Sequence, residues 1–258
     1  MFQAMMSASA ALKKQQMRLD KVATNVANVN TVAYKNFRLD FKDSRYSTGI
    51  VPGGPRSPEA TQQRGHGVLV AGIGIDFRGG GLQVTELPLD FALEGEGFFS
   101  VGDLSGNVFY TRNGNFTLSA EADGNYLVNA NGLYVLDADG QRIRLPVNTT
   151  SISVNTSGDM IFTSINEETT ARLGVFTFRN QTGLLSIGNS LFAEGEASGE
   201  RLLPEGTRVR QGVLEMSNVS LGEEMTRMIR TQRAFQLASR ALSTADDMEG
   251  IANNMRRG

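Results

Sequence analysis

The segment LKKQQMRLDKVATNVANVNTVAYKNFRLDF, residues 12–41, decides how this chain folds, because its apolar residues recur at alternating steps of three and four. That spacing places them on one face of a helix and is typical of helices that pack against other helices. The stripe comprises Met5, Ala8, Leu12, Gln15, Leu19, Val22, Val26 and Val29, and Gln15 is its only polar member. We predict an N-terminal helix of about 40 Å, at about 1.5 Å per residue, which ends near the poor helix formers between Asn28 and Thr31.

A second stripe of the same period occupies the other end of the sequence. Its members are Leu221, Met225, Met228, Phe235, Ala238, Leu242, Ala245, Ala252 and Met255. Ser220 and Glu223 form a capping-box pattern, which favours a helix that starts at this point. Neither stripe can remain exposed to water, so we expect the two helices to pack together and against neighbouring molecules.

The middle of the chain has the period of a β-sheet. Apolar residues alternate between residues 89 and 145. Turn dipeptides recur every eight to ten residues, at Asn113-Gly114, Asp123-Gly124, Asn131-Gly132 and Asp139-Gly140. This spacing predicts a β meander, and a second alternating set extends the β region towards residue 205.

Residues 46–88 fit neither period, since they hold many glycines, short apolar runs and a group of prolines at positions 52, 55 and 58. We interpret them as extended or loop-rich structure. The predicted fold is therefore mixed α and β, with a discontinuous coiled-coil-like domain of N- and C-terminal helices, an extended glycine-rich segment and a central all-β domain. The expected boundaries are residues 1–40 with 212–258 for the helical domain, 41–88 for the extended segment and 89–211 for the β domain.

Composition argues against several classes of function. The formal net charge is −2, so no overall field draws the chain towards nucleic acid or anionic lipid. The chain has no cysteine, and any histidine chemistry must rest on His66 alone. No run approaches the roughly 18 to 20 apolar residues of a membrane span, and residues 1–16 lack the apolar core of a cleaved signal peptide. We expect no cofactor, no metal, no nucleic-acid partner and no direct membrane insertion.

Two glycine-containing motifs resemble binding loops. Gly72-Ile73-Gly74, together with the glycines at 79–81, lacks the following helix that a phosphate-binding loop needs. The run Asp137-Ala138-Asp139-Gly140 begins like a calcium loop, but Asn148 stands where the bidentate glutamate belongs. A strand-like segment and a hairpin turn explain these motifs better.

Candidate catalytic residues are equally weak. His66 lies between two glycines, and we interpret it as an exposed loop histidine. Glu94 and Glu96 could serve a glycosidase as a carboxylate pair, yet Glu94-Gly95-Glu96-Gly97 is better explained as a solvated bend. We therefore expect no enzyme, and a carbohydrate-binding or carbohydrate-hydrolysing β protein is the alternative from a different class.

The apolar stripes remain as the candidate functional surface, and we predict that they form a subunit interface. The residues expected there are Met5, Leu12, Leu19, Val22, Asn25, Val26, Asn28 and Val29 in the first stripe, and Leu221, Met225, Met228, Phe235, Leu242 and Ala245 in the second. A pairing of the stripes within one monomer is the simpler alternative. Their position at the two ends of the sequence favours contacts between molecules.

Residues 12–41 also resemble the N-terminal signature of bacterial flagellar rod, hook and hook-junction proteins. Residues 213–248, VLEMSNVSLGEEMTRMIRTQRAFQLASRALSTADDM, resemble the matching C-terminal signature. Between them, LDFALEGEGFFSV at residues 89–101, with the run Tyr110 to Gly114, resembles the start of the β domain of that family. Chain length, the glycine-rich segment and GNSLFAEGEASG at residues 188–199 are most similar to a distal rod subunit, with a proximal one as the alternative.

This resemblance implies a structural subunit of the flagellar basal body that assembles helically and transmits torque. It implies that both terminal helices line an axial core. Because the helices carry the stripes but lie outside the compact β region, we further hypothesise that they are disordered in the monomer and fold when they join the growing end. The implied partners are copies of the chain, other rod proteins, the hook protein and the type III export apparatus, with the P and L rings as further candidates. Export would then occur without a cleaved signal.

Overall fold

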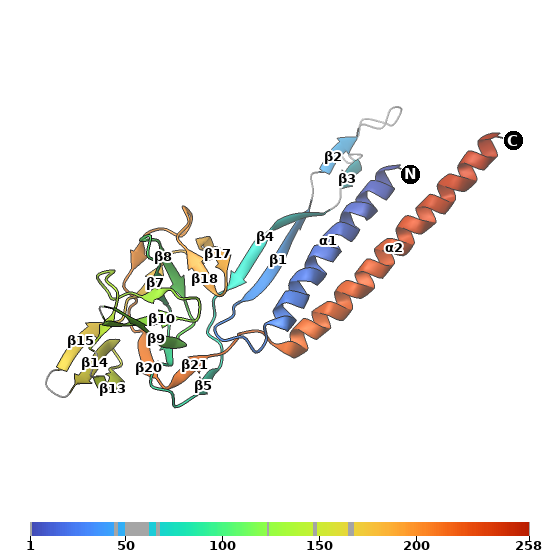
Figure 1. Ribbon diagram of the computed structural model, residues 1–258. Coiled ribbons are helices and arrows are strands. Elements are labelled where there is room, and N and C mark those ends of the chain that lie inside the picture. Colours follow the sequence, from blue (N-terminus) through green and yellow to red (C-terminus); the bar gives the residue numbers. More distant parts are fainter. Residues whose placement is uncertain are drawn as a thin grey trace. The chain divides into compact units, whose positions relative to one another are not determined.

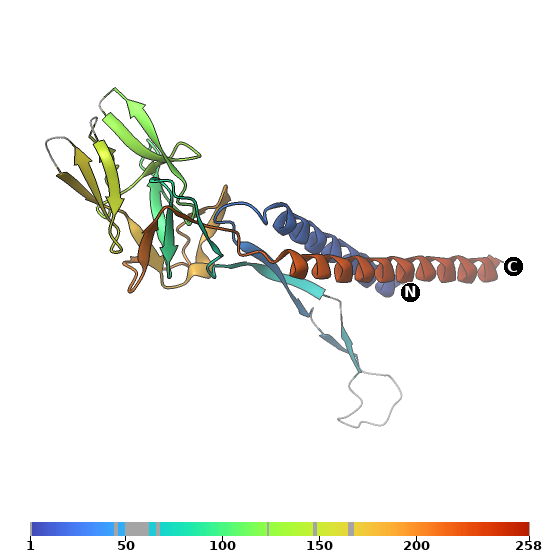
Figure 2. The same ribbon diagram turned by 90° about the horizontal axis from the view of Figure 1, so that it is seen from below.

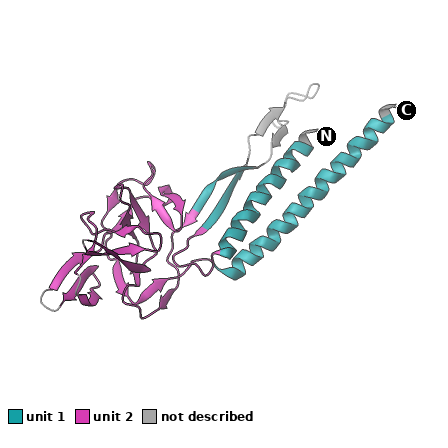
Figure 3. Cartoon of the chain, viewed as in Figure 1, with its two compact units in different colours: residues 1–27, 37–74, 220–258 teal, residues 28–36, 75–219 magenta. Residues whose placement is uncertain are grey.

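The computed structural model describes residues 2–43, 46–49, 62–65, 68–122, 124–146, 149–164 and 168–257. The chain divides into two compact units, which Figure 3 colours separately. The first unit combines residues 1–27, 37–74 and 220–258, and the second combines residues 28–36 and 75–219. Each unit is therefore built from segments that lie far apart in the sequence.

The first unit is built around two antiparallel helices that lie side by side, α1 (Phe2–Ala27) and α2 (Leu221–Arg257) (Figures 1 and 2). The two predicted terminal helices are confirmed. Helix α1 ends directly before Asn28, and α2 begins directly after Ser220, whose carbonyl oxygen accepts the Glu224 N–H at 3.0 Å. Neither of these described helices has the length and apolarity that crossing a membrane requires.

Strands accompany the helices in the first unit. Strand β1 (Asn36–Asp43) pairs with β4 (Val68–Asp76), and β2 (Tyr46–Gly49) pairs with β3 (Gln62–Gly65). Cations on α1 lie over aromatic rings of β1, with Arg18 at 5.6 Å from the Phe41 centroid and Lys21 at 5.7 Å from that of Phe37. The described part of the segment predicted as extended is thus largely strand, whereas Pro52, Pro55, Pro58 and His66 lie outside the described residues.

The second unit is a β domain, and the predicted large central β region is confirmed. Its main sheet has the strand order β12-β10-β11-β7-β8-β18-β17, with β9 beside β10, β16 beside β7, and β19 beside β16. These strands are β7 (Phe98–Gly102), β8 (Val108–Thr111), β9 (Phe116–Glu121), β10 (Gly124–Asn129), β11 (Tyr134–Val135), β12 (Arg144–Leu145), β16 (Val175–Phe178), β17 (Leu185–Gly188), β18 (Leu191–Ala193) and β19 (Arg201–Leu202).

Smaller sheets complete this unit. A three-stranded sheet contains β13 (Thr149–Val154), β14 (Asp159–Ser164) and β15 (Glu168–Arg172). Two pairs join distant segments, β6 (Phe91–Glu94) with β20 (Arg208–Gln211), and β5 (Leu82–Val84) with β21 (Val213–Glu215). A short 3-10 helix, η1 (Gln181–Gly183), precedes β17.

Aromatic side chains fill the core of the β domain. One cluster includes Phe91, Phe99 and Phe116, and the rings of Phe99 and Phe116 meet edge to face with centroids 5.4 Å apart. A second cluster contains Phe98 and Phe192, whose centroids are 5.7 Å apart. Consecutive residues Phe98 and Phe99 thus serve opposite faces of β7, as the pleat of a strand requires.

The meander prediction is correct at some turns and wrong at one. Antiparallel pairing joins β7 with β8, β9 with β10 and β10 with β11, and Gly132 and Gly140 take positive φ angles in their turns. Asn113-Gly114 does not form a hairpin, because β8 and β9 are not paired with each other. Instead the Gly114 carbonyl oxygen accepts the Phe91 N–H at 2.9 Å, so the chain is drawn onto β6. Asp123 lies outside the described residues.

Gly114 gives the first test. A Cβ at this position would lie 1.9 Å from the Phe91 carbonyl oxygen, so we expect Gly114→Ala to lower the free energy of unfolding of the β domain by about 2–3 kcal/mol. Gly81→Ala is the matched control, because no atom lies within 4 Å of its Cβ position, and we expect a change within about 0.5 kcal/mol. Denaturant unfolding measures both, and equal stabilities would contradict the close approach.

Candidate subunit interface

Most of the predicted interface residues lie where α1 and α2 face each other. On α1, Val22 and Asn25 are buried. The partly buried members are Met5, Leu12, Leu19 and Val26 on α1, and Met228, Phe235, Leu242 and Ala245 on α2. These side chains are therefore shielded from water within a single chain, in which α1 packs against α2.

Four predicted residues lie elsewhere. Asn28 and Val29 are partly buried in the β-domain unit, after the end of α1. Leu221 and Met225 are exposed on α2, with 41% and 51% of their surface accessible. These two side chains are available to another molecule.

Helix α2 carries a second apolar face that the sequence stripe did not identify. Ile229, Leu237 and Ile251 are 52%, 66% and 59% exposed, and none was among the predicted interface residues. They follow Met225 and precede Met255 along the helix, with spacings such as Met225 to Ile229 that keep side chains on one side. The signal was present in the sequence as a second set of apolar positions between those of the stripe. An apolar face on each side of one helix exceeds what pairing with α1 alone can cover.

A buried polar cluster lies at the start of α2. The Asn25 side-chain nitrogen donates to the Phe37 carbonyl oxygen at 2.9 Å and to Glu224 Oε2 at 3.3 Å, and Asn25 Oδ1 accepts the Phe37 N–H at 3.1 Å. Arg227 Nη1 donates to Glu224 Oε1 at 2.7 Å. These bonds join the end of α1, the first residues of β1 and the first turn of α2.

A second buried cluster lies in the β-domain unit and is ionic. Lys35 Nζ donates to Glu215 Oε1 at 2.6 Å, and Arg112 Nη1 donates to Glu215 Oε2 at 3.3 Å. The Gly80 N–H also donates to Glu215 Oε1, at 2.9 Å. The side chains of Lys35 and Glu215 are each 1% exposed. Burial lowers the pKa of Lys35 below its usual value, and the adjacent Glu215 carboxylate opposes that shift.

Backbone and amide contacts extend this ionic cluster. The Ala33 N–H donates to the Glu215 carbonyl oxygen at 2.8 Å, and the Asn36 N–H donates to Asn218 Oδ1 at 2.8 Å. The Asn218 side-chain nitrogen donates to the Asp76 carbonyl oxygen at 2.8 Å. Residues 33–36 and 215–218 are thereby held together although they are about 180 positions apart.

The glycine-rich motif before β7 is part of the same arrangement. Arg112 Nη2 donates to the Gly95 carbonyl oxygen at 2.7 Å, and Gly95 and Gly97 have φ angles of 121° and 134°. Such angles favour glycine. The bend at Glu94 to Gly97 thus presents a carbonyl to a buried arginine, which is a structural role.

The other motifs also have structural roles where they are described. Asp137 Oδ1 accepts the N–H groups of Asp139 and Gln141 at 2.9 and 2.7 Å, which closes a turn between β11 and β12. Gly72 and Gly74 lie within β4, and β5 follows it. Within the described ranges, no group of three or more His, Cys, Asp or Glu side chains could hold a metal ion. His66 and Asn148 lie outside those ranges.

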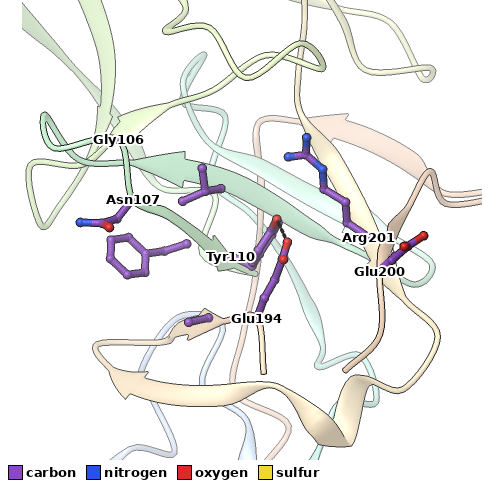
Figure 4. A pocket seen from close by; sticks show the side chains of 9 residues that line it. Gly106, Asn107, Tyr110, Glu194, Glu200 and Arg201 are labelled. Carbon is purple, nitrogen blue, oxygen red and sulfur yellow. Dashed lines mark hydrogen bonds between the residues drawn. The ribbon is translucent and has the colours of Figure 1, made fainter. Parts of the chain in front are cut away.

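A pocket of about 840 Å³ opens on the β domain between residues of β8, β18 and β19 (Figure 4). The Tyr110 hydroxyl donates to Glu194, and its ring meets Phe178 edge to face with centroids 4.8 Å apart. Burial and the Glu194 carboxylate raise the pKa of Tyr110 above its usual value. Arg201 lies 5.0 Å from the Phe176 ring centroid. The hydrogen bond between Tyr110 and Glu194 thus joins β8 to the residue that follows β18.

Comparison with protein families identifies three matching regions. They are "Flagella basal body rod protein" over residues 5–35, "Flagellar hook protein FlgE/F/G D1 domain" over residues 92–162, and "Flagellar basal body rod FlgEFG protein C-terminal" over residues 210–255. The three charged residues of the buried ionic cluster, Lys35, Arg112 and Glu215, each fall in a different region. The cluster therefore joins all three matched parts of the chain.

Relatives match along the whole chain. The flagellar basal-body rod protein FlgG of Borreliella burgdorferi is 36% identical over 271 residues, and that of Bacillus subtilis is 33% identical over 268 residues, each alignment covering 100% of both chains. The flagellar hook-basal body complex protein FlhP of Bacillus subtilis is 31% identical over 271 residues, covering 99% of this chain and 100% of the relative.

The buried carboxylate gives the second test. Glu215→Gln removes the charge that pairs with Lys35 and Arg112, so we expect a loss of about 3–5 kcal/mol in the free energy of unfolding. Glu94→Gln is the matched control, since the Glu94–Arg210 pair is exposed and we expect a change of at most about 1 kcal/mol. Denaturant unfolding measures the stability of both variants. A small loss in the free energy of unfolding for Glu215→Gln would mean that the cluster is not essential for stability.

Proposed function

Because this chain belongs to the family of flagellar basal-body rod proteins and is a structural subunit of the rod, we propose that it polymerises helically through its terminal helices. The polymer is the drive shaft that carries torque from the motor to the hook. The observation that carries this proposal is the second apolar face of α2, which includes Ile229 and Leu237. Several large apolar side chains exposed along one side of a helix favour contact with another protein. The function needs neither catalysis nor a cofactor.

Helical growth requires a contact between two different surfaces whose rotation does not close into a ring. The helical unit offers such surfaces, because Met6 and Met17 are exposed on α1 and a separate apolar face is exposed on α2. Each apolar side chain that becomes fully buried between subunits stabilises the assembly by roughly 1.5 to 3 kcal/mol. One repeated contact of this kind is sufficient to build an axle.

The predicted interface residues divide between two roles in this proposal. Leu221 and Met225 contact the neighbouring subunit directly. The inner stripe, which includes Leu19 and Phe235, pairs α1 with α2 and forms a coiled-coil-like axial core together with the same helices of other copies. Residues 1–40 and 212–258 then line the axis, and the β domain forms the outer layer.

Family membership also implies assembly with other rod and hook components of the basal body. We place the chain in the distal rod, in agreement with the relatives named FlgG, and a proximal rod or hook-type position is the alternative. The P and L rings are proposed contacts of the outer layer. Export through the flagellar type III apparatus without a cleaved signal is the proposed route to the envelope.

An exposed position on α2 tests the assembly surface. We expect Ile229→Asp to leave the stability of the isolated chain almost unchanged, because the side chain is 52% exposed, and to reduce the number of rods at least tenfold. Leu104→Asp is the control, since it makes the same chemical change at a 73% exposed leucine of the β domain. Electron microscopy of isolated basal bodies counts the rods. Normal numbers of rods with Ile229→Asp would contradict the proposed interface.

Exchange of amide hydrogens tests whether the terminal helices become fully ordered only on assembly. Among the described side chains of α2, residues 221–255, only Glu224 and Thr231 are buried, so the isolated helix pair should open readily. We expect faster exchange in residues 1–40 and 212–258 than in the β domain of the purified monomer. Strong protection of both terminal segments from exchange in a proven monomer would mean that the two apolar stripes bury each other within one chain.

A further inference from the structure

Gln15 interrupts the apolar stripe of α1 at its centre. The stripe positions on either side are Leu12 and Leu19, which are partly buried, and Val22 beyond them is buried. The adjacent glutamine, Gln16, is exposed and donates to Asp20 Oδ1 at 3.0 Å on the surface of the helix. Of these two glutamines, only Gln15 occupies a position that faces the packed side.

The side-chain oxygen of Gln15 is left unpaired in the described part of the chain. This Oε1 atom is buried, and among the described residues it has no hydrogen-bond partner. Buried side-chain polar atoms in folded proteins nearly always have a partner, because an unpaired one loses its bonds to water without replacement. An unpaired carbonyl oxygen in the middle of the packed face of a helix is therefore unusual, and it indicates that the atom binds a group outside the described residues.

The described residues on the packed face of α2 offer no side-chain donor at this level. Helices α1 and α2 run antiparallel, and the Asn25–Glu224 hydrogen bond fixes their alignment. Gln15 lies ten residues before Asn25, so equal rise per residue places it near the position about ten residues after Glu224. The partly buried residues there are Ala234, Phe235 and Ala238, which carry no hydrogen-bonding side chain.

We propose that Gln15 sets the register of the assembled rod core, by accepting a hydrogen bond from an N–H group on a terminal helix of a second copy of this chain. The inference rests on the proposed function. A single polar residue in an apolar helical seam costs stability and specifies alignment, because only one alignment gives it a partner. The residue as a whole is partly exposed and its side chain is flexible, so its amide can turn towards a neighbour.

Suitable donors lie on the exposed surface of α2. Gln232, Arg233 and Gln236 are exposed and end in amide or guanidinium N–H groups. They lie at the same level of the helix pair as Gln15, by the alignment above. If helix α2 of a second copy packs along the apolar stripe of α1, it brings such a donor to Gln15. If that helix is displaced along the stripe, the Gln15 carbonyl oxygen stays unpaired.

Gln15→Met tests the proposal, because methionine keeps the length of the side chain and removes its polar atoms. Gln16→Met is the matched control one residue away. In the purified monomer, we expect Gln15→Met to raise the Tm by about 2–4 °C and to slow amide exchange in α1 and α2, since an unpaired polar atom is lost. In basal bodies isolated from cells that express only the variant, we expect a severalfold loss of straight, regular rods.

The outcomes separate this inference from the proposed function. Stabilised monomers together with irregular or missing rods, and normal rods with Gln16→Met, support the register role. Normal rods with Gln15→Met overturn it, whether or not the monomer is stabilised. If Ile229→Asp abolishes rods while Gln15→Met does not, assembly through α2 stands and the register role is wrong.

Discussion

The carboxylate of Glu215, buried between Lys35 and Arg112, is the constraint on which the rest of the β-domain unit depends. A buried carboxylate without its cations is strongly unfavourable, so the fold must bring residues 35, 112 and 215 together wherever else the chain goes. The Gly80 N–H completes the site. Because this unit includes residues 28–36 as well as 75–219, the cluster joins both ends of the β domain to its middle. An apolar cluster could stabilise such a site equally well but would not select one arrangement so strictly.

The helical unit repeats this principle with its own polar cluster. Glu224 is buried and binds Asn25 and Arg227, so the end of α1 and the first turn of α2 have one defined alignment. The Asn25 amide also holds the first part of β1 through both backbone groups of Phe37. Two matched family regions, residues 5–35 and 210–255, thus supply residues to a polar cluster in each unit. The buried polar residues of these two regions therefore align segments that lie far apart in the sequence.

Periodicity predicted the elements well, since it reports local geometry. The steps of three and four predicted both helices, and alternation with turn dipeptides predicted hairpins such as that at Asn131-Gly132. The buried ionic cluster was not predictable from one sequence, because Lys35 and Glu215 are 180 positions apart and nothing local pairs them. Asn113-Gly114 failed for a related reason: its contact with Phe91 is tertiary and overrides the turn preference of the dipeptide. Ile229, on the outer face of α2, was not predicted at an interface because its position falls between those of the apolar stripe.

Burial along the helix pair is uneven, and this unevenness connects the structure with assembly. Val22 and Asn25 are buried near the end of α1, and Glu224 and Thr231 are buried near the start of α2, whereas the described side chains of α2 beyond Thr231 are partly or fully exposed. The helix pair is therefore closely packed at one end, whereas at the other end its side chains remain partly or fully exposed. A rod subunit needs this combination, because a pair that satisfied itself along its whole length would leave neighbours little to bind. In the proposed assembly, other copies cover the remaining apolar surface of the helices, while the polar cluster of Asn25 and Glu224 keeps α1 and α2 aligned.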